Sequence, residues 1–217
     1  MAFPSTDLLW IVEIVKFVVL AAAGGVLFFR WFRSERHFLT DTPFLFALGF
    51  FCIASGEAVD AVFDSGFATY NLTFYQFRAG LLGIGMLFVL YATVLIWFVE
   101  RQRIGHLLII LYAIMFILAL IIAQTPDQVR SYTIPFLLIA YIGFLATFLL
   151  AWFMKRLPDV HGLIMCLGGA IALVGQILKN PLEAIGYIWI SELIDLLGLS
   201  ILFLGLLVKP GYAKSPS

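Results

Sequence analysis

Charge is what this sequence lacks most. Of its 217 residues only 12% are charged and 63% are hydrophobic, whereas a typical soluble domain is about half apolar and about a quarter charged. A soluble fold of this length would not have enough polar residues to cover its surface, so we exclude one. The same composition excludes a disordered chain, and the balance of 13 basic against 13 acidic residues excludes a nucleic-acid partner.

Cysteine is nearly absent as well. The two cysteines, Cys52 and Cys166, both lie in apolar runs, so they support neither a disulfide framework nor a zinc site. The sequence also has no Gly-rich phosphate loop, no nucleophile motif and no cysteine–histidine pair. An enzyme is therefore the least favoured class of function, and we predict no catalytic residues.

Long apolar runs are what the sequence does contain. A helix needs about 20 apolar residues to cross a bilayer core of roughly 30 Å, and seven stretches qualify, with approximate cores at 8–29, 43–63, 79–99, 104–123, 133–153, 162–178 and 184–208. Lipid offers the backbone no hydrogen-bond partners, so we predict that each stretch is a helix. The predicted fold class is an all-α integral membrane protein with seven transmembrane helices, placed in a plasma or cytoplasmic membrane.

Basic residues cluster in alternate links between these stretches. One side carries most of them: Arg30, Arg33, Arg36, Arg101, Arg103, Lys155, Arg156, Lys209 and Lys214. By the positive-inside rule we expect the N-terminus outside and the C-terminus in the cytoplasm. The zero net charge is then a cancellation across the bilayer, with nine bases and four acids inside against four bases and nine acids outside.

Three pairs of stretches share short patterns in the same order. Leu48-Gly49 and Gly56 match Leu167-Gly168 and Gly175, Leu81-Leu82-Gly83 matches Leu196-Leu197-Gly198, and Trp31-Phe32 matches Trp152-Phe153. These matches predict a parallel 3+1+3 duplication, in which residues 1–99 form the first three-helix unit, 100–131 the linker helix and 132–217 the second unit. Parallel repeats of this kind occur in some transporters.

The predicted topology, seven helices with an external N-terminus, resembles that of the microbial rhodopsins. That family needs a retinal-binding lysine about four residues after an aspartate in the last helix. Here Leu199 stands at that distance from Asp195. We therefore expect no retinal and no other cofactor.

Nine polar residues fall in the outer halves of the predicted spans, where ionisable groups are costly and mark candidate functional sites. We expect ligand- or ion-binding roles for this set: Glu13, Lys16, Glu57, Asp60, Arg78, Gln176, Lys179, Glu192 and Asp195. Several are three residues apart, which places each pair on one helix face that lipid cannot solvate. Glu192 and Asp195 should lie about 12 to 17 Å into the last span, at the helical rise per residue.

Acids outnumber bases in this set by five to three. Either some carboxyl groups keep their protons, or a cation or an amine ligand supplies the balance. The competing interpretation is structural, with ion pairs that only fix helix register, and it is favoured for the residues nearest to water: Asp64, Arg78, Lys179 and Glu183. Asp60 and Lys179 occupy matching positions of the predicted repeat and are candidates for a gate at the outer mouth.

A metal centre is not expected. The two Glu-x-x-Asp faces resemble, in type only, the acidic motifs of Mg²⁺-dependent lipid transferases, whose chemistry belongs on the cytoplasmic side. The three histidines, His37, His106 and His161, lie at predicted cytoplasmic helix boundaries, which is typical of solvated side chains.

Three functions remain open. The first is a carrier of a small solute or cation that uses the outward acidic cluster, which the predicted duplication favours. The second is a ligand-binding receptor or sensor that signals through a partner, and the third is an accessory subunit of a larger membrane complex. Beyond lipid, a membrane protein or a second copy of the chain is a candidate partner, since the small residues at 21–25 and 168–170 would allow close helix contact.

Overall fold

The computed structural model describes residues 6–34, 38, 41–67, 69, 71–98, 102–155, 157 and 159–210. This part of the chain forms seven α-helices: α1 Thr6–Phe32, α2 Thr42–Asp64, α3 Leu72–Trp97, α4 Gln102–Ile122, α5 Pro126–Phe153, α6 Gly162–Ala184 and α7 Ile188–Leu207. All seven are long and apolar enough to cross a membrane, which confirms the predicted number and type of elements. Arg36, His37, Arg101, Arg156 and Lys214 lie outside the described residues.

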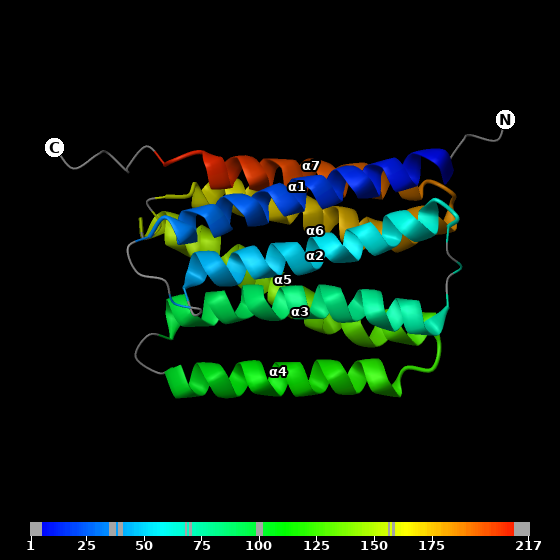
Figure 1. The fold of residues 1–217 in the computed structure, drawn as a ribbon, viewed down its shortest axis with the longest axis horizontal. Coiled ribbons are helices and arrows are strands. Elements are labelled where there is room, and N and C mark those ends of the chain that lie inside the picture. The colour runs from blue at the N-terminus through cyan, green and yellow to red at the C-terminus, as the bar shows by residue number, and fades with distance from the viewer. Residues whose placement is uncertain are drawn as a thin grey trace.

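The helices lie side by side along one axis, with the start of α1 and the end of α7 at opposite ends of the bundle (Figure 1). We name the ends by their residues. The cluster end is the one at which α1 begins and α2 ends, and the Arg30 end is the opposite one, at which α1 and α7 end.

Six helices form a ring in chain order, and the seventh lies outside it. Each of α1, α2, α3, α5, α6 and α7 packs on the next, and α7 packs back on α1, whereas α4 packs on α3 and α5. Figure 1 shows α4 at the edge of the bundle, below α3. This position suits the predicted linker helix, whose apolar residues, such as Leu111, Ile114 and Ile121, are exposed as in a lipid-facing helix.

Two helices begin about two turns before their predicted apolar cores. Helix α3 begins at Leu72 instead of Ala79, and α5 begins at Pro126 instead of Thr133. In each case a polar residue caps the helix ahead of the apolar run: the Asn71 side chain accepts a hydrogen bond from the backbone of Phe74, and the Thr125 side chain accepts one from Gln128. Hydropathy marks the membrane core, while the cap sets the first helical residue.

The boundary between α6 and α7 also differs from the prediction. Helix α6 continues past Leu178 to Ala184, and α7 begins at Ile188 instead of Ala184. Gly186 ends α6 with a φ of 78°, a left-handed conformation that glycine adopts without strain. The later start of α7 places Glu192 about 6 Å and Asp195 about 10 Å into that helix, which is shallower than expected.

Reciprocal glycine contacts bring two helix pairs together. A Cβ on Gly49 would meet the Gly85 carbonyl at 3.0 Å, and one on Gly85 would meet the Gly49 carbonyl at 2.8 Å. Gly168 and Gly198 face each other in the same way, at 2.7 Å in both directions. The α2–α3 and α6–α7 crossings therefore share one small-residue geometry.

Three glycines of the small-residue patches pack within the bundle. A Cβ on Gly24 would meet Phe51 at 3.0 Å, and one on Gly169 would meet Leu145 at 2.8 Å, whereas Gly25 has open space beside it. Gly24, Gly168 and Gly169 thus serve internal packing.

The Arg30 end is filled by apolar side chains. Phe46, Phe144 and Phe148 are buried together, with ring centroids 4.7 Å apart for Phe144 and Phe148 and 5.6 Å apart for Phe46 and Phe148. Arg30 of α1 donates hydrogen bonds to the carbonyls of Leu206 (2.6 Å) and Asp159 (3.2 Å). These bonds tie the end of α1 to the end of α7 and to the link before α6.

Candidate functional site

A fully buried lysine stands at the centre of the polar residues. The Lys16 ammonium of α1 lies 2.6 Å from Glu192, 2.8 Å from both Glu13 and Glu57, and 3.3 Å from Asp195. The lysine is 1% exposed and all four carboxylates are buried. We call these five residues the Lys16 cluster; they come from α1, α2 and α7.

Two further bases extend this cluster toward the mouth of the bundle. Arg78 of α3 forms an ion pair with Asp60, and Lys179 of α6 lies 2.6 Å from the second carboxylate oxygen of Glu192. The side chains of Arg78 and Lys179 are 24% and 21% exposed. Each of the two side chains reaches inward to a buried acid, so the structural ion pairs favoured for these two bases are present.

The predicted gate between Asp60 and Lys179 is not formed as a direct pair. Asp60 is paired with Arg78, and Lys179 is paired with Glu192. Gln176, which matches Glu57 in the predicted repeat, instead donates a hydrogen bond of 2.7 Å to Asp195. The structure thus gathers all nine predicted site residues at the cluster end, in pairings that the sequence did not specify.

A cavity of about 680 Å³ opens beside the Lys16 cluster. All six ring helices contribute to its lining, and α4 does not. Glu57, Asp60, Glu192 and Asp195 line it, whereas Lys16 and Glu13 are not among its lining residues. The buried Lys16 ammonium is therefore separated from the cavity by carboxylates that line it.

Helix α5 adds residues that the sequence analysis missed. Thr133, Leu137 and Tyr141 lie four residues apart, on one helix face, and all three line the cavity. Tyr141 lies close enough to Asp195, Glu57 and Lys16 to interact with their charges. The missed signal is a threonine and a tyrosine on one face of an apolar helix, which a search restricted to charged residues does not detect.

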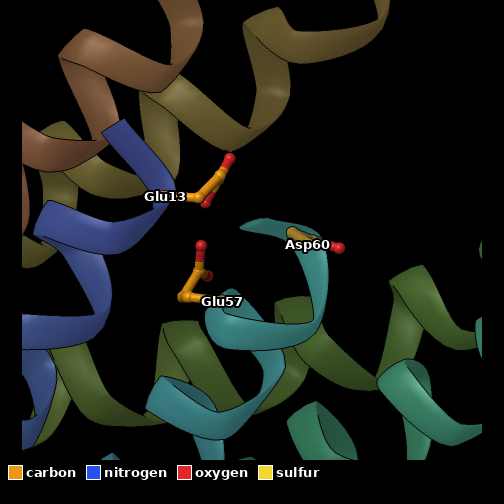
Figure 2. A group of neighbouring side chains, drawn as sticks. All are labelled: Glu13, Glu57 and Asp60. Atoms are coloured by element: carbon orange, nitrogen blue, oxygen red, sulfur yellow. The ribbon is translucent and has the colours of Figure 1, made fainter. Parts of the chain in front are cut away.

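Three carboxylates at this end have oxygens within 4.8 Å of one another: Glu13, Glu57 and Asp60. Figure 2 shows the Glu57 carboxylate directed toward Glu13, while the Asp60 carboxylate points away from both. Oxygen ligands of this kind suit Mg²⁺ or Ca²⁺. Here, however, the Lys16 ammonium and the Arg78 guanidinium already lie against these oxygens, so a metal ion would meet two positive charges.

The described histidines lie at the Arg30 end, away from the cluster. The ring of His106 is 2.9 Å from the Tyr91 hydroxyl, and His161 accepts a hydrogen bond from the Ile164 backbone at the start of α6. Leu199, at the position where a retinal lysine would be needed, is buried and lines the cavity. The absence of a retinal site stays a prediction.

Comparison of this chain with family models, curated proteins and solved structures finds no match.

Proposed function

We propose that this membrane protein is a carrier of a small organic cation, such as an amine, that binds in the cavity at the cluster end. The observation that carries the proposal is the difference between the two ends of the bundle: one is hollow and acidic, and the other is closed. With the predicted orientation, the cavity faces the outside of a plasma or cytoplasmic membrane.

The charges of the cavity wall favour a cation. Six acids line it against three bases: Glu57, Asp60, Asp64, Glu183, Glu192 and Asp195 against Arg78, Arg130 and Lys179. A cleft with one dominant sign of charge and low-dielectric walls concentrates ions of the opposite sign.

The size and the apolar wall favour an organic molecule. About 680 Å³ lies in the range of small-molecule pockets, roughly 300–1,000 Å³, and is larger than a bare metal ion needs. Ile134, Leu137 and Leu138 of α5 provide apolar surface in the same cavity. An ammonium group could lie against the carboxylates while its carbon chain contacts α5.

The predicted duplication would allow the cavity to open alternately to the two sides of the membrane, by movement of one unit against the other. The glycine crossings of α2–α3 and α6–α7 are alike, although Gly85, and not the predicted Gly83, takes the place of Gly198. This likeness favours two similar units that move as bodies. The ion pairs of Lys16 with Glu192 and Asp195 join these predicted units, whereas those of Arg78 with Asp60 and of Lys179 with Glu192 lie within one unit each. A cation that competes with Lys16 for these carboxylates would weaken the link between the units.

Uptake into proteoliposomes tests the carrier. We would reconstitute the full chain and measure uptake of radiolabelled ethanolamine, choline and putrescine against protein-free liposomes. We expect uptake of at least one amine, loss of that uptake in Asp195→Asn and Glu57→Gln, and retention in Asp127→Asn. Asp127 is the matched control, an exposed acid of α5 that does not line the cavity.

A ligand-binding receptor is the second candidate. The closed Arg30 end, with its aromatic core and the hydrogen bonds of Arg30, favours capture without passage. A receptor would show amine-dependent thermal stabilisation that Asp195→Asn removes, with no uptake of any of the three amines.

A further inference from the structure

Glu13 and Glu57 form a buried carboxyl pair whose hydrogen bonding is incomplete. Their carboxylate oxygens lie within 4.8 Å of each other, with Glu57 directed toward Glu13 (Figure 2), and the residues are 1% and 5% exposed. Among the described residues, neither the Oε2 atom of Glu13 nor that of Glu57 has a hydrogen-bond partner. Both atoms lie 2.8 Å from the Lys16 ammonium but outside the directions of its hydrogen bonds.

The donors of Lys16 are too few for its neighbours. An ammonium group has three N–H donors, and four carboxylates surround this one. The hydrogen bonds of Lys16 go to Glu192 at 2.6 Å and Asp195 at 3.3 Å. At most one N–H is left for Glu13 and Glu57 together, and an ionised carboxylate cannot donate to its neighbour.

The other charged groups around Glu13 and Glu57 do not supply the missing hydrogen-bond donor. The groups that face it from the packed helices are Lys16 of α1, Asp60 of α2, Glu192 and Asp195 of α7, Arg78 of α3 and Tyr141 of α5. Arg78 is paired with Asp60, and Lys179 is paired with Glu192. Five ionised acids would face three bases in a buried site, where excess like charge is strongly unfavourable.

We propose that Glu13 and Glu57 bind one proton between them, as a carboxylic acid hydrogen-bonded to a carboxylate. The proton comes from a hydronium ion that reaches the cavity: one of its O–H bonds breaks and leaves a water molecule, and one carboxyl O–H bond forms on the pair. It supplies the donor that the pair lacks and removes one of the excess negative charges. Unlike a metal ion, a proton occupies no additional volume beside Lys16.

The cavity gives this proton a route. Glu57 lines the cavity and Glu13 is not among its lining residues, so Glu57 exchanges the proton with water and Glu13 holds it on the inner side. If the protein is the proposed cation carrier, this pair is its coupling site, because release of the proton adds a negative charge beside the carboxylates that the cation would use. This coupling role rests on the proposed function, whereas the proton site rests on the geometry of the pair.

Infrared spectroscopy of the full chain in lipid nanodiscs tests the site without any ligand. At pH 7 we expect a C=O stretching band of a protonated carboxyl group that shifts in D₂O. Cell-free synthesis with glutamate carrying ¹³C in its side-chain carboxyl should shift this band, and synthesis with similarly labelled aspartate should not. The isotope shift in the labelled wild type tests the proposal even if a variant does not fold.

Matched variants then assign the band to the pair. Glu13→Gln and Glu57→Gln should each abolish it, and Asp127→Asn, which changes an exposed acid outside the cavity lining, should retain it. The proposal is overturned if the wild type has no such band, if the band follows the aspartate label, or if it persists in either glutamine variant. A band without amine uptake would support the proton site and reject the carrier. Amine uptake without the band would support the carrier and reject the proton site.

Discussion

At the cluster end, six helices surround a cavity of about 680 Å³ and bury a lysine among four carboxylates. At the Arg30 end, the same helices close on Phe46, Phe144 and Phe148, and a hydrogen bond from Arg30 to a backbone carbonyl joins α1 to α7. Apolar packing tolerates small shifts of one helix against another, whereas a buried network of charges tolerates neither a missing partner nor an extra one. The two ends should therefore respond differently to the loss of one side chain.

The largest effect should come from Lys16→Met. This change removes the base shared by four buried carboxylates, and breaking a buried ion pair on one side costs about 3–5 kcal/mol. We expect a large fall in the Tm of the detergent-purified protein, with Lys209→Met, at an exposed lysine of the other end, close to wild type. Acidification should reduce the difference in Tm between the two variants, because protonated carboxyl groups no longer repel one another. Equal Tm values for the two variants at pH 7 would contradict this account of the cluster.

The next largest effect should come from Gly175→Ala. A Cβ at Gly175 would lie 2.7 Å from the Asp195 nitrogen and 2.9 Å from the Ser191 carbonyl, so α7 must shift at the cluster. Overpacking of this kind costs about 1–3 kcal/mol, and we expect a fall in Tm together with weaker amine binding. The control is Gly25→Ala, because Gly25 has open space beside it. A Tm equal to that of the control would show that α7 can move without cost.

A smaller effect is expected from Arg30→Gln at the opposite end. The variant loses the hydrogen bonds to Leu206 and Asp159, and since Arg30 is partly exposed we expect a loss of only about 1 kcal/mol. Its clearer signature should be faster labelling of Cys166, which packs against the apolar core near this end, by a maleimide in a Cys52→Ser background. Arg33→Gln, at an exposed arginine three residues on, is the control. Unchanged labelling would mean that Arg30 does not hold this end closed.

The sequence predicted the helices and the membership of the site better than the contacts within it. Runs of about 20 apolar residues defined seven helices, and the cost of charge in lipid placed Lys16, Glu57 and Asp195 inside the bundle. Which acid lies against which base depends on how each helix is rotated about its axis and shifted along it. The later start of α7 shows that the sequence does not fix even the position along the axis. Tyr141 was missed because a tyrosine in an apolar helix has no property, in sequence alone, that separates a cavity wall from a lipid-facing surface.

The smallest effect should come from Glu183→Gln, which removes the ion pair with Arg130. The two partners are 3.3 Å apart, the same separation as between Lys16 and Asp195. The side chains of Arg130 and Glu183 are 39% and 53% exposed, however, against 1% and 3% for Lys16 and Asp195. Water and salt screen an exposed pair, which typically contributes about 0–1 kcal/mol, so we expect the Tm to change little. Asp195→Asn should lower the Tm more than Glu183→Gln, because the buried ammonium loses a partner that water cannot replace. Equal effects would show that distance, and not burial, decides how strongly an ion pair stabilises this bundle.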